Sequence, residues 1–221
     1  MTYSVRDVQA RCAALGFDPG PIDGMMGPQT RRATAAAFEA RGVRKVADLF
    51  GPSGLHRVHW HWTAGADGLI DMERRAYNEL VDRDGNVWDG VFRPEAQATY
   101  RIGRAASHTL NANTGAIGLA ADAMAGAQER PFFAGAAPLT WPQVHALCER
   151  TAQHCEMYDI PVSKWSTLTH AEVQPTLGIR QRFKWDITWL PDMSAPGDPV
   201  QIGERLRGMV REHLQDVRAA A

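Results

Sequence analysis

The chain has 221 residues, of which 44% are hydrophobic and 22% charged, a composition typical of a folded globular protein rather than a disordered one. Its 24 lysines and arginines balance 25 acidic residues, and the resulting net charge of −1 argues against a nucleic-acid partner. No apolar run approaches the roughly 20 residues of an integral membrane helix, and the first residues lack the pattern of a signal peptide. The length allows one large domain, or a medium domain with a small module.

Residues 1–44 have the pattern of a small all-α unit. Apolar residues recur three and four positions apart from Val5 to Leu15, which predicts a helix that Gly16 ends. A stretch rich in glycine, proline and aspartate follows at 17–24 and predicts a loop. A second helix is expected from about Pro28 to near Gly42.

The loop between these helices resembles the peptidoglycan-binding domain found at the ends of many bacterial and phage wall hydrolases. The matching residues are LGFDPGPIDG at 15–24 and GPQT at 27–30. One position departs from the family, because Ala37 stands where an aromatic residue is usual and Phe38 follows it. The resemblance implies a wall-binding module that depends on Asp23, Gly24, Gly27 and Thr30. Taken alone, the same residues indicate only the turns of a helical docking module without a ligand.

A linker is expected at 45–54, which includes the turn-rich GPSG at 51–54, and a second domain at 55–221. Residues 57–62 alternate with a period of two, which predicts a strand. Val58, Trp60 and Trp62 would lie on one face of this strand, and His59 and His61 on the other.

The rest of the second domain alternates between strand and helix patterns. A hairpin is expected at 79–82 and 86–88, a buried strand at 116–120 and another strand at 164–169. Thr140 and Gln143 form a capping-box pattern for a helix that reaches about residue 158, and an amphipathic helix begins at about 199 and packs on the domain. The pattern predicts the α/β class, with a mixed central sheet flanked by helices.

The three cysteines are expected to be reduced. Cys148 and Cys155 lie on one predicted helix, ~10.5 Å apart along its axis, which is too far for a disulfide bond.

A metal site is suggested by His61, His170 and Asp186, since two imidazoles and one carboxylate would leave an open fourth position on zinc. The spacing by itself is weak evidence, because such residues occur at similar separations in many proteins. Periodicity also does not choose between His61 and His59, which lie on the same face about 6.6 Å apart.

Four segments of the second domain, in order, resemble the zinc-dependent N-acetylmuramoyl-L-alanine amidases of the type 2 class. That class includes phage endolysins and shares its fold with peptidoglycan recognition proteins. The segments are VHWHWTA at 58–64, YNELVDRDG at 77–85, NTGAIG at 113–118, and THAEV at 169–173 followed by KWD at 184–186.

The resemblance implies a role for each matching residue. The zinc (Zn2+) ligands would be His61, His170 and Asp186, and the catalytic residues that do not bind zinc would be Tyr77 and Lys184. The residues on the substrate side would be His108, Asn113 and His59. Some relatives carry a glutamate as general base near position 120, where this chain has Ala120, and this departure places more weight on Tyr77.

The expected function is hydrolysis of the amide bond between N-acetylmuramic acid and L-alanine in bacterial peptidoglycan. The alternative is a non-catalytic peptidoglycan recognition protein. A zinc peptidase is disfavoured because no His-Glu-x-x-His motif occurs, and a glycosidase because no convincing carboxylate pair occurs. A further alternative is a structural or interaction protein in which the set of histidines is coincidental. Removing metal from such a protein would leave its properties unchanged.

The absence of a signal peptide predicts a protein made in the host cytoplasm, and we expect it to be a monomer. It would reach the cell wall, or the periplasm, through a holin-like partner that permeabilises the membrane.

Overall fold

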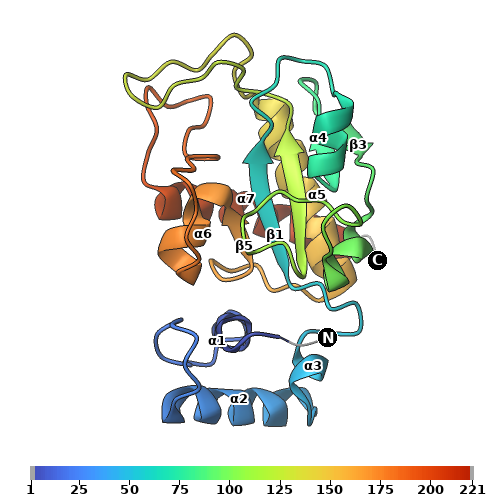
Figure 1. Ribbon diagram of the computed structural model, residues 1–221, viewed down its shortest axis with the longest axis vertical. Helices are drawn as coiled ribbons and strands as arrows, with labels where there is room; N and C mark the ends of the chain where they lie inside the picture. The colour runs from blue at the N-terminus through green and yellow to red at the C-terminus, as the bar shows by residue number, and fades with distance from the viewer. Residues whose placement is uncertain (1–2, 220–221) are drawn as a thin grey trace.

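A computed structural model describes residues 3–219, and Figure 1 shows three N-terminal helices beneath a larger α/β body. The helices of the N-terminal part are α1 (Val5–Ala14), α2 (Pro28–Arg41) and α3 (Val46–Leu49). The body contains, in order, β1 (Arg57–Trp62), α4 (Asp71–Ala76), β2 (Glu79–Val81), β3 (Val87–Asp89), the 3-10 helix η1 (Pro94–Thr99), β4 (Ala116–Ala121), α5 (Trp141–Tyr158), β5 (Thr167–Thr169), α6 (His170–Leu177) and α7 (Pro199–Ala219). No helix within the described range is both long and apolar enough to cross a membrane.

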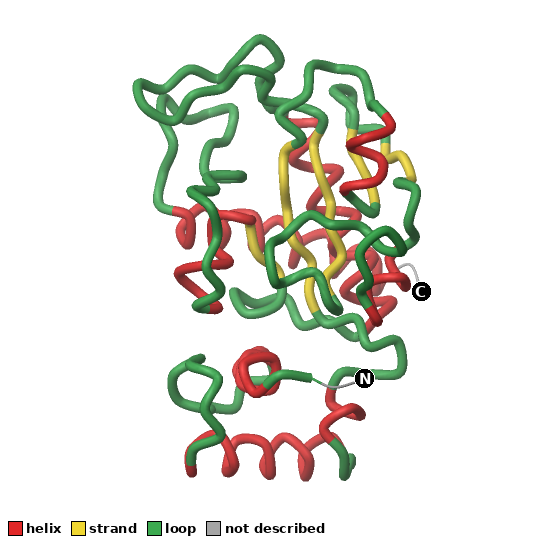
Figure 2. The backbone as a smooth tube through the Cα atoms, viewed as in Figure 1, coloured by secondary structure: helices red, strands yellow, loops and turns green. Residues whose placement is uncertain are grey.

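The five strands form one sheet in the order β3-β2-β4-β1-β5. Strands β2, β4, β1 and β5 run parallel to their neighbours, while β3 pairs antiparallel with β2 as the predicted hairpin. Figure 2 shows the two long central strands, with helices gathered behind them and loops crossing in front. The predicted mixed sheet flanked by helices is therefore confirmed.

One face of β1 lies in the main hydrophobic core. Val58, Trp60 and Trp62 join a buried cluster with residues of α5 and α7. The indole nitrogen of Trp60 donates a 2.7 Å hydrogen bond to Thr151 on α5, so its single polar atom is satisfied within the core. The opposite face of β1, with His59 and His61, turns toward the loop that precedes β4, and this places the candidate site outside the apolar core.

Helix α5 begins as its capping box predicts. Thr140 is its N-cap, and the side chains of Thr140 and Gln143 each bond the other's backbone N–H. Cys148 and Cys155 on this helix are free and buried, as is Cys12 on α1. Burial in an apolar environment raises the pKa of the Cys155 thiol to about 12, so this thiol stays protonated at neutral pH.

The N-terminal helices pack around a small cluster of their own, to which the expected linker contributes. Leu49 and Phe50 are fully buried there, and the guanidinium of Arg11 donates a 2.6 Å bond to the backbone oxygen of Leu49. The segment 45–54 was expected to be a plain linker, but its first half forms α3 because these two apolar side chains complete the cluster.

Several polar contacts hold the N-terminal helices against the α/β body. Asp7 of α1 accepts a 2.8 Å ion-paired bond from Arg57 at the start of β1. Arg6 donates to the backbone oxygen of Leu177 at 2.8 Å, and Arg11 donates to that of Asp159 at 3.1 Å. The N-terminal helices are therefore docked on the body at the lower edge of the sheet in Figure 1.

Candidate metal centre

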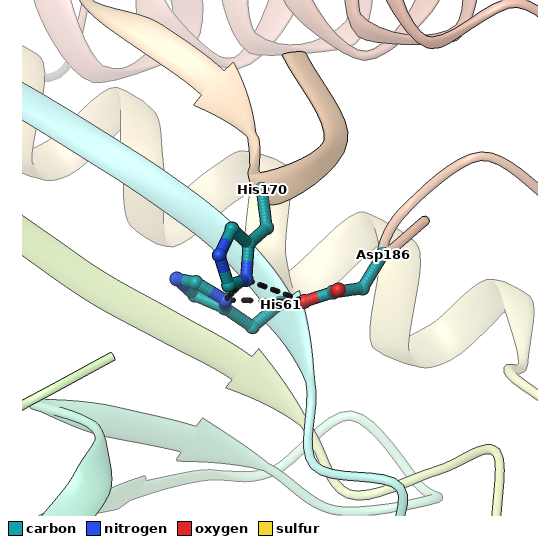
Figure 3. A group of neighbouring side chains, drawn as sticks. All are labelled: His61, His170 and Asp186. Atoms are coloured by element: carbon teal, nitrogen blue, oxygen red, sulfur yellow. Dashed lines mark hydrogen bonds and ion pairs between the residues drawn. The ribbon is translucent and has the colours of Figure 1, made fainter. Parts of the chain in front are cut away.

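Three side chains far apart in sequence meet at the end of β1. His61 lies near the end of that strand, and His170 is the first residue of α6, directly after β5. Since β5 runs parallel to β1 and pairs Thr169 with Trp60, the two histidines lie at the same edge of the sheet. Asp186 reaches them from the loop after α6, and Figure 3 shows the three side chains converging.

The converging atoms have the spacing of a metal-ligand set. His61 Nδ1 lies 3.0 Å from His170 Nδ1 and 3.2 Å from Asp186 Oδ2, and His170 Nδ1 lies 3.0 Å from the same oxygen. Ligands bonded to one tetrahedral zinc at ~2.05 Å would be about 3.3 Å apart. Among residues 3–219, this is the one group of three or more histidine, cysteine or acidic residues with such geometry. The three residues therefore fit one zinc ion and leave a fourth position for water or substrate.

Neighbouring hydrogen bonds leave both Nδ1 atoms free to bind a cation. Gln181 Oε1 accepts from His170 Nε2 at 3.1 Å, which places the proton of that ring on Nε2. The backbone oxygen of Ala116 accepts from His108 Nε2 at 3.1 Å, so His108 Nδ1 is an acceptor for His61 Nε2 at 3.2 Å. With both Nε2 atoms protonated, two nitrogen lone pairs face each other at 3.0 Å, and a cation between them would relieve their repulsion.

A threonine hydroxyl connects the histidines behind the site. Thr109 Oγ1 lies 3.1 Å from His59 Nδ1, 2.9 Å from His108 Nδ1 and 3.4 Å from His61 Nε2. The loop that carries Thr109 is held by Asn113, whose side-chain oxygen accepts from the backbone N–H groups of His108 and Thr109. His59 is fully buried and belongs to this supporting layer, while His108 and Asn113 also line the cleft.

A glycine on β4 makes room for the ring of His108. A β-carbon at Gly118 would overlap that ring, so glycine is the residue that lets the ring pack this close to the strand. This packing gives a structural reason for the last residue of the NTGAIG segment.

Burial and mutual attraction set the charges of the metal-free site. Burial lowers the pKa of His61 to about 4, against the opposing effect of its bond to Asp186, so this imidazole is neutral at pH 7. Burial acts to raise the pKa of Asp186, but interactions with His170 and His61 outweigh it and hold that pKa well below its usual range. A neutral imidazole and an ionised carboxylate are the forms that bind zinc.

His170 is fixed by the first turn of α6. Thr169 is the N-cap, and its backbone N–H donates to Glu172 at 2.8 Å while its hydroxyl accepts from the backbone of Glu172 at 3.2 Å. Arg207 of α7 donates two hydrogen bonds to the Glu172 carboxylate, at 3.0 and 3.2 Å, and a third to the backbone oxygen of Thr167 at 2.8 Å. Both charged side chains are wholly buried, so α7 supports the turn that presents the ligand.

The two expected catalytic residues that do not belong to the ligand set differ in their surroundings. The ring of Tyr77 is 5.2 Å from that of His61, and its hydroxyl lies 3.5 Å from the backbone oxygen of Trp62. Burial raises the pKa of Tyr77, with the charges of Asp186 and Glu73 adding to the effect, so the hydroxyl keeps its proton at neutral pH. Lys184 is exposed and lines a cleft of about 610 Å³ together with His170 and His108.

The residues of the expected wall-binding loop hold the loop itself in shape. Asp23 accepts from the side chain of Gln9 at 2.9 Å and from its own loop at Met25, and Thr30 donates to the backbone oxygen of Pro19 at 2.9 Å. Gly24 has a φ of 83°, a conformation that favours glycine. Gly27 is the N-cap residue of α2.

The sequence motifs did not identify three residues that support the metal ligands: Gln181, Thr109 and Arg207. Gln181 and Thr109 had no motif to mark them, because their role depends on histidines that are distant in sequence. Arg207 was visible only as a polar residue on an amphipathic helix. The Thr169-x-x-Glu172 pattern was the available signal for α6, since it is a capping box.

Comparisons with known proteins give only distant likenesses. No protein-family model matches the sequence, and no curated protein matches it significantly. Among solved structures, the N-acetylmuramoyl-L-alanine amidase LysC from Clostridium intestinale URNW is 15% identical with a TM-score of 0.41, covering 69% of this chain and 84% of that one. The endolysine N-acetylmuramoyl-L-alanine amidase LysCS from the same organism is 14% identical with a TM-score of 0.41, covering 69% and 82%.

A third likeness is the ectodomain complex of peptidoglycan recognition proteins LCa and LCx bound to tracheal cytotoxin. It is 16% identical with a TM-score of 0.34, covering 60% of this chain and 81% of that one. Because all three TM-scores lie below 0.5, the functional inference rests on the side chains of the site.

Proposed function

We propose that this protein is a zinc-dependent peptidoglycan amidase that cleaves the bond between N-acetylmuramic acid and L-alanine. The observation that carries the proposal is the set of three donor atoms on His61, His170 and Asp186, 3.0–3.2 Å from one another. The four sequence segments that resemble type 2 amidases contain all three residues and supply the substrate class.

Zinc held by these ligands would act as a Lewis acid toward the substrate carbonyl and would lower the pKa of a water molecule. The residues around the site would supply the remaining chemistry. Tyr77, which keeps its proton, is placed beside His61 to orient that water or to donate a proton to the leaving amine. Lys184 would add positive charge at the cleft wall, where the carbonyl oxygen becomes negative.

The N-terminal helices would hold the enzyme on the wall and raise its local concentration there. This proposal rests on the resemblance of the loop at 15–30, and release to the wall by a membrane-permeabilising partner belongs to the same proposal. Co-sedimentation with insoluble peptidoglycan measures wall binding separately from catalysis if the Asp186→Asn variant is used. Retention of this variant in the pellet is the expected result, and its absence from the pellet would contradict the wall-binding proposal.

Mass spectrometry of the products released from purified peptidoglycan tests the reaction. Free stem peptides that begin at L-alanine are expected, and they should disappear with a zinc chelator and return when zinc is added. Intact muropeptides with new reducing ends would indicate a glycosidase. Binding to peptidoglycan without any product would indicate a recognition protein.

Two variants test the residues that assist the metal. Tyr77→Phe and Lys184→Met are each expected to lower kcat by about 100-fold, since donors to a developing charge contribute on this scale. Zinc content should stay unchanged in both. Lys164→Met is the matched control, because this exposed lysine lies outside the cleft and its loss should leave kcat unaltered.

A further inference from the structure

The segment 180–184, with the sequence RQRFK, lies between two of the proposed metal ligands, and Gln181 is its one buried residue. The side chain of Gln181 is buried and bonds to His170, as described above. Arg180, Arg182 and Lys184 of the same segment are exposed. The inward glutamine therefore anchors three cations next to the metal centre.

These three cations have no acidic partner in the part of the chain that the structure describes, residues 3–219. None of them forms an ion pair or a side-chain hydrogen bond with a described residue. Together they line a second cavity of about 360 Å³, whose other walls come from Ala171, Gln174, Pro175, Gln181 and Phe183. No acidic side chain lines this cavity, so its field favours an anion.

The second cavity and the cleft beside the metal centre are adjacent. Gln181, Arg182 and Lys184 line both of them. A ligand with its reacting bond in the cleft therefore has the adjoining cavity within reach of a charged group of the same molecule.

The exposed position of the Phe183 side chain is not explained by packing within the fold. Its side chain is fully exposed, and its φ of 48° is in the left-handed region, which is unfavourable for a bulky residue. An exposed aromatic ring between two cations would offer an apolar surface to a ligand whose charged groups bind its neighbours.

We propose that segment 180–184 is a carboxylate-binding subsite for the peptide part of the substrate, with Arg180 and Arg182 as its main cations and Phe183 packing on the peptide's apolar atoms. The inference rests on the proposed amidase function, which supplies a peptide attached to the bond being cleaved. A carboxylate on that peptide is favoured over the phosphate of a separate wall polymer, because the second cavity shares Gln181, Arg182 and Lys184 with the cleft and so lies within reach of the same ligand.

Two synthetic muramoyl peptides test the subsite: one with free carboxylates and one with the same groups amidated. The zinc-loaded full chain is expected to prefer the free acid by about tenfold in kcat/KM, since each exposed ion pair contributes a factor of about 1.4 to 5. The Arg180→Gln/Arg182→Gln double variant should reduce this preference to about one, mainly through KM. Arg32→Gln on α2, an exposed arginine with no ion pair among residues 3–219, is the control that should keep the wild-type preference. An equal preference in wild type and double variant would overturn the proposal.

Binding of the free stem peptide, measured by calorimetry, separates the subsite from the reaction because this peptide has no bond to cleave. Binding that is lost in the double variant supports the subsite even if no amidase activity is found. Cleavage without any dependence of peptide binding on the two arginines overturns the subsite and leaves the proposed function standing. A glycerol-phosphate polymer that binds more tightly than the peptide, through the same arginines, would assign the subsite to phosphate and overturn the peptide assignment.

Discussion

The two faces of β1 carry different kinds of side chain, which alternate along the six residues of the strand. On one face, Val58, Trp60 and Trp62 pack into an apolar core against α5 and α7. On the other face, His59 and His61 are just as buried but are surrounded by hydrogen-bonding partners. The apolar face is stabilised by removing surface from water, while the polar face depends on a network whose members must all be present.

This difference shows why the polar face has the character of a functional site. Burying an imidazole costs stability unless its nitrogens are paired, and His59 Nε2 has no partner among the described residues. A strand that only supported the fold would carry apolar residues on both faces. The predictions that follow test this difference, first on β1 itself and then through the contacts that support the site.

The largest effect is expected from paired alanine substitutions on the two faces. His61→Ala should lower zinc affinity by well over 100-fold and abolish hydrolysis, because it removes a ligand while leaving the apolar core untouched. Trp60→Ala should destabilise the fold by about 3–5 kcal/mol but leave the zinc affinity of the folded protein unchanged. Calorimetric zinc titration and urea unfolding measure the two quantities. Equal zinc affinity in wild type and His61→Ala would break the distinction between the faces.

The next effect concerns Arg207 and Glu172, the buried ion pair that supports the first turn of α6. Arg207→Met should lower the free energy of unfolding by about 3–5 kcal/mol, because it leaves the Glu172 carboxylate buried without its partner. Arg211→Met, on the same helix but half-exposed, should cost less than about 1 kcal/mol. Urea unfolding compares the two variants, and similar losses would show that burial of the pair contributes nothing.

A smaller effect should follow from loss of a partner that orients a ligand. Gln181→Leu removes the acceptor for His170 Nε2 and should weaken zinc binding by about 10- to 100-fold without removing a ligand. Gln201→Leu, at an exposed position of α7, serves as the control. If Gln181→Leu bound zinc as tightly as wild type, the hydrogen bond would not set the tautomer of His170.

The last prediction is a gradual effect, a dependence of stability on pH in the metal-free protein that accumulates over several pH units. Burial lowers the pKa of His61 to about 4 and that of His56 to about 3, whereas both would titrate near 6.5 when unfolded. Between those values the unfolded chain binds protons that the folded protein does not. Stability should therefore be fully present above about pH 6.5 and fall toward pH 4, by about 1.4 kcal/mol per pH unit for each histidine.

Urea unfolding at a series of pH values measures this slope. The variant His56→Gln should reduce it by the contribution of one proton. A free energy of unfolding that stays constant or rises between pH 6.5 and pH 4 would contradict the buried, neutral state of these histidines.

The sequence predicted those parts of the fold that depend on local pattern. The bounds of β1 at 57–62, the hairpin and the capped start of α5 all follow from alternation, turn residues or capping residues close together in the chain. Helix α6 was missed because its N-cap, Thr169, is also the last residue of β5, so a strand pattern ends where the helix begins. Strand β5 is correspondingly shorter than expected, at three residues.

The candidate site was predictable only in part, because local sequence pattern does not show which distant residues meet. Sequence motifs singled out His61, His170 and Asp186, and the structure brings these three together. Periodicity does not distinguish His61 from His59, because both lie on one face of β1, and the resemblance favours His61. In the structure, His61 is the one of the two that reaches His170 and Asp186. The supporting contacts of Thr109 and Gln181 arise from loops that the local sequence does not place.

The most direct test of the metal centre is a crystal structure of the zinc-loaded protein with anomalous diffraction measured at the zinc edge. One zinc peak is expected, about 2.0–2.2 Å from His61 Nδ1, His170 Nδ1 and an oxygen of Asp186, with a fourth position open to the cleft. Absence of zinc from this position at saturating concentration would contradict the account, as would zinc bound through His59 or His108 in place of His61.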